Sequence, residues 1–484
     1  MLVIKLAGFA FIYLMRPNFR FGLLRRRLPL FYVLLPVVGL LAWALHVPDG
    51  SRNYIYAFGV GTVSWLLCLA ASHQIRLSIE KKGAAAMDAT LRVFTILNFA
   101  LCIAQLVAIS VKTGALNPYD YRLPFPYGMS SGDRVFGVLF ENSTYNVMVS
   151  MMLMLYFIFR KSTAYAIMAA AAVLMVFSNF SNLIYIGILS LFLVTGLLQK
   201  TPFGARLNSR KALIFRIWPD RRTVPLILLL MALLPAFYLV FSPQNFNYFE
   251  RESARASTEP SLLNPKRTKL SGKLGAEVPD AYLSLWQRVD RLDYKKYQKP
   301  LTVAASAKTR DFKKRATLTK EAIHALVGKK LSFMETAAYL KSDVRVLLTG
   351  SGVARFSSLA AHRISGGDTG RIFRKIPTYK TPLYLENHGL ITKTRLAAPP
   401  ALYATSNWPE SFYNQLAGEY GLIGVLLFLF YYIAHYVRRD RKTSYGLWAA
   451  AVMVPFALIN YLFEAYCPIL IMEALLELNA AEPS

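Results

Sequence analysis

The sequence predicts an all-α, polytopic membrane protein with about 10–12 transmembrane helices and one large extracytoplasmic loop domain. Three observations lead to this fold class. Apolar residues gather in blocks long enough to cross a bilayer, every second connection between the blocks is basic, and one long polar stretch interrupts the array. We therefore divide the chain into N-terminal transmembrane helices at 1–241, a loop domain at 242–411 and C-terminal transmembrane helices at 412–484.

The composition supports the apolar blocks as membrane segments. Hydrophobic residues make up 55% of the chain and the mean hydropathy is +0.35, yet the net charge is +29. Soluble globular proteins seldom combine these values, whereas membrane proteins with basic loops often do. Most of the clear blocks have about the length that a helix needs to cross about 30 Å of hydrocarbon. The clear blocks are 30–47, 54–72, 89–111, 135–159, 165–178, 182–198, 224–241, 412–437 and 447–463, and the weaker ones are 2–15 and 468–478.

The basic connections set the predicted orientation. Arg and Lys gather after every second block, at 16–27, 76–82, 160–161, 200–222 and 438–442. The positive-inside rule places these connections in the cytoplasm. The alternate connections, among them the long stretch 242–411, are then extracytoplasmic, and we expect a multi-pass protein of the bacterial inner membrane whose site faces the periplasm.

The long extracytoplasmic stretch is strongly basic, with 29 Lys and Arg but only 14 Asp and Glu. Such a surface attracts phosphorylated lipid carriers, anionic head groups or acidic polysaccharide. A solvated surface without a partner is the alternative, and nucleic acid is not expected on that side of the membrane. Helical spacing predicts a helix at 310–327. A short apolar run at 344–348, closed by a Gly-rich turn, predicts a loop into a second helix at 356–362.

Several kinds of chemistry lack a motif in this sequence. No Gly-rich phosphate loop follows a predicted strand, and His-Glu-x-x-His does not occur. The three cysteines have no metal-ligand or disulfide spacing. We therefore expect no metal, no cofactor and no nucleotide-driven transport.

Three stretches carry a resemblance to a known family. The first enters a membrane block from outside and reads Arg134-Val-Phe-Gly-Val-Leu-Phe-Glu141-Asn142. The second lies in the outer loop and reads Arg315-Ala-Thr-Leu-Thr-Lys-Glu-Ala322, followed by Leu347-Leu-Thr-Gly350-Ser-Gly352-Val-Ala-Arg-Phe356. The third re-enters the membrane and reads Glu410-Ser-Phe-Tyr-Asn414-Gln415-Leu-Ala-Gly-Glu419-Tyr-Gly421-Leu-Ile-Gly424. Taken together, in order and spacing, these stretches resemble the O-antigen polymerase and ligase family.

The resemblance implies an all-helical, GT-C-like membrane glycosyltransferase that needs no metal. Its substrate would be an oligosaccharide linked to undecaprenyl pyrophosphate in the lipid bilayer, and a chain-length regulator or a flippase is left open as a further partner. With the resemblance as the guide, we take Glu410, Arg315 and Glu419 as the implied catalytic residues, although Glu410 departs from the ligase pattern. The implied substrate-binding residues are Arg134, Glu141, Arg355 and Gln415, together with His388, which lies outside the three stretches.

The chemistry of such a transfer explains these residue types. The leaving pyrophosphate gains negative charge, and Arg presents a fork of donors to phosphate oxygens while staying charged. A carboxylate or imidazole must take the proton of the acceptor hydroxyl, and Glu410, His362 or His388 could do so. Each residue also has a structural interpretation without a catalytic role. In that interpretation Arg315 is one charge on a solvated helix face, and a lone His is a packed side chain.

Three functions remain open at this stage. Ligases commonly carry His-Asn shortly before the Glu of the re-entering helix, where this chain has Glu410 and Ser411. This departure favours a polysaccharide polymerase over a ligase that moves glycan to lipid A core or protein. A flippase or exporter of lipid-linked glycan is the third hypothesis. It is disfavoured because charges gather at the ends of the membrane blocks and no related halves are visible.

Overall fold

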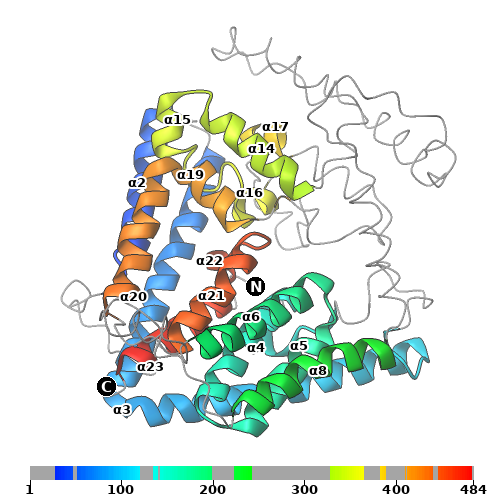
Figure 1. The fold of residues 1–484 in the computed structure, drawn as a ribbon. Helices are drawn as coiled ribbons and strands as arrows, with labels where there is room; N and C mark the ends of the chain where they lie inside the picture. Colours follow the sequence, from blue (N-terminus) through cyan, green and yellow to red (C-terminus); the bar gives the residue numbers. More distant parts are fainter. Residues whose placement is uncertain are drawn as a thin grey trace, which may run out of the picture.

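The computed structural model describes residues 28–46, 52–119, 134–139, 142–198, 223–241, 328–364, 382–388, 409, 411–439 and 445–481. These residues form helices and short turns without a strand, so the all-α prediction is confirmed for the described part of the chain. Figure 1 shows two groups of helices, one containing α2 and α19 and the other containing α4, α5, α6 and α8. The predicted segments 2–15 and 310–327 lie outside the described residues.

Helix α3 (Arg52–Thr113) belongs to both groups. Two predicted membrane blocks, 54–72 and 89–111, join into this one helix, which leaves helical geometry only at Gly83 with φ of 82°. The connection between the blocks is rich in Ala, Lys and Glu, which favour helix. An ion pair of 2.9 Å between Arg76 and Glu80 adds to it. Glycine adopts the positive φ without steric cost, and α3 changes direction within its length (Figure 1).

The second group packs α4 (Ser143–Phe159) and α5 (Thr163–Val176) against each other and against α3. Helices α6 (Asn179–Leu198) and α8 (Thr223–Phe241) complete it. The predicted block 135–159 begins too early. The Asn142 side chain caps α4 by accepting the backbone N–H of Thr144 at 2.8 Å. The residues before it form the short 3₁₀ turn η3 (Gly137–Leu139) instead of helix.

The first group contains α2 (Phe31–Leu45) and α19 (Phe412–Leu427), which continues through the π-helical segment η9 (Phe428–Ile433) into α20 (Ala434–Arg439). Helix α23 (Cys467–Ala481) packs against α3, α4 and α21. The predicted block 447–463 divides into α21 (Tyr445–Ala457) and α22 (Leu462–Ala465). Pro455 lacks the N–H that a longer helix would use, and α21 ends in a turn just after it.

Part of the predicted loop domain is also helical. It contains α14 (Gly328–Leu340), α15 (Val344–Thr349), α16 (Leu359–Ile364) and α17 (Pro382–Asn387). A turn does follow the predicted apolar run, but it extends over residues 350–358, and the helix after it begins at Leu359 instead of the predicted residue 356. Helices α14 and α15 pack on α19, so this part of the loop domain covers one end of the first group (Figure 1).

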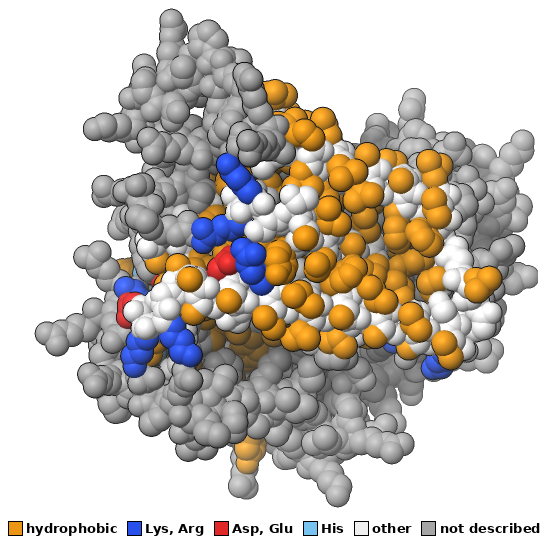
Figure 2. Space-filling view, turned by 90° about the horizontal axis from the view of Figure 1, so that it is seen from below, with side chains coloured by type: hydrophobic (Ala, Val, Ile, Leu, Met, Phe, Trp, Pro, Cys, Tyr) orange, Lys and Arg blue, Asp and Glu red, His pale blue; other side chains and the backbone are white. Residues whose placement is uncertain are grey.

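Three described helical stretches are long and apolar enough to span a membrane: Tyr54–Thr113, Thr223–Phe241 and Phe412–Val437. Shorter apolar helices accompany them, including α2, α4, α5 and α21. Figure 2 shows a broad apolar face with charged side chains gathered toward one end. Helix α3 exposes the apolar side chains Val93, Ile96, Leu97, Ile103, Val107 and Val111. These surfaces fit a membrane protein.

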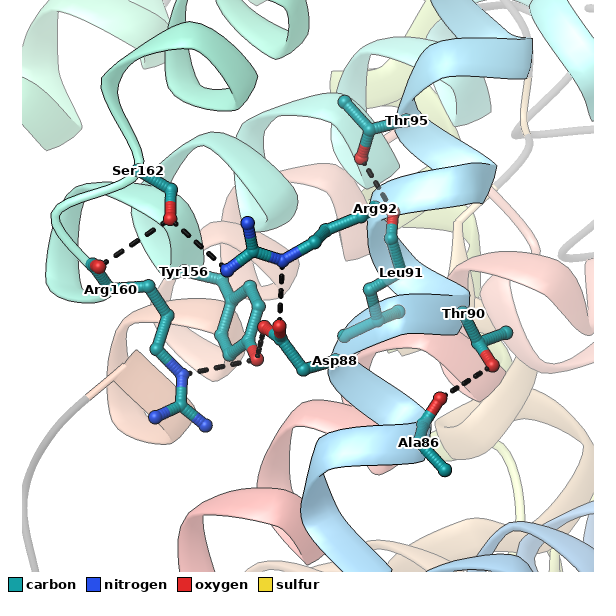
Figure 3. A network of polar contacts seen from close by, with 9 residues as sticks. All are labelled: Ala86, Asp88, Thr90, Leu91, Arg92, Thr95, Tyr156, Arg160 and Ser162. Atoms are coloured by element: carbon teal, nitrogen blue, oxygen red, sulfur yellow. Dashed lines mark hydrogen bonds and ion pairs between the residues drawn. The ribbon is translucent and has the colours of Figure 1, made fainter.

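Two charged side chains at the start of the predicted block 89–111, Asp88 and Arg92, form an ion pair (Figure 3). Asp88 accepts from Arg92 at 2.7 Å and from the Tyr156 hydroxyl at 2.5 Å. Arg160 donates to Tyr156 at 3.1 Å, and Arg92 reaches Ser162 at 3.3 Å. This network joins α3 to the α4–α5 turn, which the predicted orientation places at the cytoplasmic surface.

Candidate functional site

The turn between α15 and α16, which we call the 350–358 loop, lies against a break in α19. Gly421 has φ of 60°, and this break frees carbonyl groups that a regular helix would use. The carbonyl of Gly418 accepts the N–H of Ser351, and the carbonyl of Glu419 accepts the N–H of Gly352, both at 2.9 Å. A Cβ on Gly350 would lie 2.3 Å from the Glu419 backbone. Glycine is therefore required where the two segments meet.

The Glu419 carboxylate holds the 350–358 loop by its backbone. Its side chain is fully buried, and Oε2 accepts the N–H of Ala354 at 3.0 Å. Oε1 accepts the N–H groups of Phe356 at 3.1 Å, Ser357 at 3.3 Å and Ser358 at 3.1 Å. Successive backbone N–H groups that converge in this way form a site for an anion. Because Glu419 already occupies it, the geometry favours a positioning role for Glu419 over the implied catalytic role.

A second acidic residue, Glu464 of α22, extends this arrangement. Its Oε2 accepts the N–H of Leu359 at 2.5 Å, and Oε1 accepts the N–H of Ala360 at 3.5 Å. It therefore caps the first turn of α16, whose leading N–H groups have no partner within the helix. Sequence analysis missed Glu464. The available signal was an acidic residue at the edge of an apolar block.

The 350–358 loop places Arg355 beside the ends of α2 and α3. The Arg355 guanidinium lies 5.1 Å from the ring centroid of Tyr54, and the Arg355 side chain is 8% exposed. The Tyr54 hydroxyl donates to the carbonyl of Val353 at 3.2 Å. His46, just past the end of α2, lies 3.2 Å from the Thr349 hydroxyl. An imidazole and a guanidinium thus share the region that the predicted orientation places outside the cytoplasm.

His46 gives this region a predicted pH dependence. Partial burial, and secondly the Arg355 cation, lower the pKa of His46 from its usual value. The unfolded chain then binds a proton more readily than the folded protein, so stability rises with pH. The His46 contribution is complete above pH of about 6.5 and is lost as the pH falls through the folded pKa. We expect the thermal midpoint of the purified wild type to fall with acidification and that of His46→Gln to fall less. Superimposable pH profiles would contradict this assignment.

A buried His–Glu pair lies behind the same loop. The Nδ1 of His388 is 3.1 Å from Oε2 of Glu335 on α14. The His388 side chain is fully buried, whereas that of Glu335 is 21% exposed, so the pair reaches the edge of the packed region. The Phe356 ring packs on His388 with centroids 4.9 Å apart and stacks on Tyr339 at 4.6 Å. A carboxylate on one ring nitrogen fixes the orientation of the imidazole and leaves the other nitrogen for chemistry.

Other buried polar atoms lie on the elements that surround this pair. Asn414 donates to the Ser332 hydroxyl at 2.9 Å, and Ser332 is one turn before Glu335 on α14. Gln415 is one turn before Glu419 on α19. Within the described part of the chain, four buried atoms on these elements and on the adjoining loop make no hydrogen bond: Nε2 of His388, Oδ1 of Asn414, Oε1 of Gln415 and Oγ of Ser357. A buried polar group without a partner is costly, so we take these atoms as candidate ligand contacts.

Four of the implied site residues come together here: Glu419, Gln415, Arg355 and His388. Comparison with known proteins returned no match to a family model, to a curated protein or to a solved structure. The site therefore rests on its own geometry. Glu335, the partner of His388, was not expected from the sequence, because no local pattern links two residues on separate helices.

Among the remaining implied residues, the structure describes the side chain of Arg134 alone. Glu141, Arg315, Glu410 and the alternative base His362 have no described side-chain placement. Arg134 begins the segment 134–139, which packs on α3 and α4. Gly137 in that segment has φ of 56°, and its N–H donates to Gln105 at 2.9 Å. A Cβ there would lie 2.1 Å from Oδ1 of Asn98, so this turn also requires glycine.

Proposed function

We propose that the protein is a multi-pass polysaccharide polymerase of the bacterial inner membrane, with a GT-C-like arrangement of helices. It would transfer glycan from undecaprenyl pyrophosphate to a lipid-linked acceptor unit on the extracytoplasmic side. The single observation that carries this proposal is the His388–Glu335 pair behind the loop that presents Arg355. The contact between the second and third family-like stretches, through Glu419 and the 350–358 loop, supports it further.

The proposed reaction assigns one role to each group. The acceptor hydroxyl oxygen attacks the anomeric carbon of the donor glycan while its proton passes to Nε2 of His388. Glu335 orients the imidazole through Nδ1 and stabilises the cation that forms. The bond from the anomeric carbon to the pyrophosphate oxygen breaks, and the bonding electrons leave with the pyrophosphate. Arg355 offsets this charge, and Arg134 and Arg315 are proposed as further contacts to the anion.

A ligase remains the alternative within the same reaction class. The residue that acts as the general base is the feature that distinguishes the two functions. Glu410 occupies the position where ligases commonly have His, while this proposal takes the base from His388 in the loop domain. Gln415 and Glu141 are proposed to contact the sugar. A lipid-linked glycan flippase is less favoured, because transport needs no imidazole that a carboxylate orients.

The test is the glycan profile of a deletion strain complemented with variants. We expect single repeat units in the deletion strain, long chains with wild type, and about 100-fold less long-chain glycan with Arg355→Ala, the loss typical of removing one charge-stabilising donor. The matched control is Arg345→Ala, because Arg345 is exposed on α15. Full-length glycan that accumulates on the lipid carrier would indicate a ligase. Normal chains with Arg355→Ala at wild-type protein levels would contradict the assignment of Arg355.

A further inference from the structure

A second polar cluster lies in the helix bundle at the opposite end of α2 from His46. Glu473 of α23 is fully buried. Its Oε1 accepts the hydroxyl of Tyr32 at 2.5 Å and that of Tyr432 at 3.0 Å. Tyr32 is near the start of α2, whereas His46 follows its last residue. At 1.5 Å per residue the two ends are about 20 Å apart, so this cluster is separate from the candidate site.

The Glu473 carboxyl has neutral donors but no cation. No Lys, Arg or His in the described part of the chain forms an ion pair with it, and Oε2 makes no hydrogen bond there. Ser72 faces the carboxyl from α3, and its hydroxyl is fully buried. Glu477, one turn further along α23, is 2% exposed. A buried carboxylate beside a second carboxyl and without a cation is strongly disfavoured.

In the described residues, the titratable and polar groups around Glu473 and Tyr32 come from five elements. They are Tyr32 of α2, Tyr432 of η9, Tyr436 of α20, Cys68 and Ser72 of α3, and Glu477 of α23 itself. Helices α4 and α21 also pack on α23, but in the described residues neither places a charged group against Glu473. None of these neighbours carries a positive charge. A proton on Oε2 is the smallest cation that offsets the charge.

We propose that Glu473 is a proton-binding site inside the bundle, where the protonated carboxyl joins α2, α3, η9 and α23. Its proton would lie on Oε2, while Oε1 keeps the two tyrosine hydroxyls. Ionisable residues within membrane bundles usually have a functional role, and π-helical segments such as η9 often accompany functional sites. The inference uses none of the residues assigned to glycosyl transfer, so either proposal can fail without the other.

The cluster is connected to the candidate site by aromatic side chains. The rings of Tyr32 and Trp65 have centroids 6.4 Å apart, and Trp65 donates to the Tyr420 hydroxyl at 2.6 Å. Tyr420 follows Glu419, which holds the 350–358 loop. Loss of the proton would place an unpaired charge at one end of this packed chain, and the contacts of Tyr32 would rearrange first.

The direct test is infrared difference spectroscopy of the full chain in lipid nanodiscs, with the proton as the probe. We expect a protonated-carboxyl band at neutral pH that disappears on alkaline titration and is missing in Glu473→Gln. The control Glu477→Gln should keep this band. An identical spectrum for wild type and Glu473→Gln at neutral pH would overturn the proposal.

Two further variants test the assigned contacts and do not depend on Glu473→Gln folding. Tyr432→Phe removes a donor that favours the ionised carboxyl, so the band should persist to higher pH. Ser72→Ala removes a second hydroxyl that favours the ionised carboxyl, so here too the band should persist to higher pH. Upward shifts of the midpoint in both variants support the site. A midpoint that stays unchanged in both would overturn it.

Discussion

Replacing His388 with Ala is expected to reduce long-chain glycan to the level of the deletion strain. If Nε2 of His388 takes the proton of the acceptor hydroxyl, its removal costs about 100- to 10,000-fold in rate, the usual contribution of a general base. Glu335→Gln should cause a smaller loss, because the amide keeps the size of the side chain but no longer stabilises a protonated imidazole. Glycan chain length on gels, normalised to protein in the membrane fraction, measures both effects.

The control for this experiment is a histidine outside the site. His435 lies on α20, beyond η9, and His435→Asn should leave the glycan profile unchanged. Thermal unfolding of each purified variant separates a lost base from a lost fold, since Phe356 and Tyr384 pack on the His388 ring. Wild-type chain lengths with both His388→Ala and Glu335→Gln, at normal protein levels, would exclude this pair as the base. Glu410 would then be the next candidate for the general base.

Replacing Glu419 with Ala is expected to release the 350–358 loop. Four buried backbone N–H groups would lose their acceptor, and each buried donor left unpaired costs about 1–3 kcal/mol. The sum is comparable to the whole stability of a typical domain, about 5–15 kcal/mol. We therefore expect poor folding or, in protein that does fold, fast hydrogen exchange at residues 354–358. Peptide-level exchange measured by mass spectrometry reports this directly.

Glu419→Gln distinguishes positioning from catalysis. The amide oxygen can still accept from the loop, but its nitrogen cannot accept from Ala354, so exchange should rise only in part and activity should fall with it. A catalytic carboxyl would behave differently: activity would disappear while the exchange rates of the loop stayed at wild-type values. The matched control is Glu335→Gln, which removes a charge near the loop without touching its backbone N–H groups and should leave exchange at residues 354–358 unchanged.

Hydropathy alone predicted most of the helices, because burial in a bilayer requires long apolar runs whatever their tertiary contacts. Its errors are local and have identifiable causes. The blocks at 54–72 and 89–111 lie on two helices of α3 that meet at a kink at Gly83, but the charged connection between the blocks is helical as well, because its residues favour helix. Block 135–159 was extended too far because the pattern does not reveal that Asn142 starts α4 as an N-cap.

The candidate site was predicted less completely. Family-like stretches pointed to Glu419, Gln415 and Arg355, and the need for a base pointed to His388; the fold places these residues around the 350–358 loop. Their local roles could not be predicted, since the sequence does not distinguish a carboxylate that binds substrate from one that binds backbone N–H groups. Only the positive φ values at Gly350 and Gly421 bring the loop onto the broken helix.

By itself, the sequence determined that the chain is helical and apolar in blocks of membrane-spanning length, with a basic loop region between them. These properties depend on residues that are close together in the sequence, so they can be predicted without knowing the tertiary contacts. Only the tertiary structure decided which polar groups meet: His388 with Glu335, Glu419 with the 350–358 loop, and Glu473 with two tyrosines. Each of these pairings joins residues far apart in the chain, and a buried polar group is satisfied by neighbours in space.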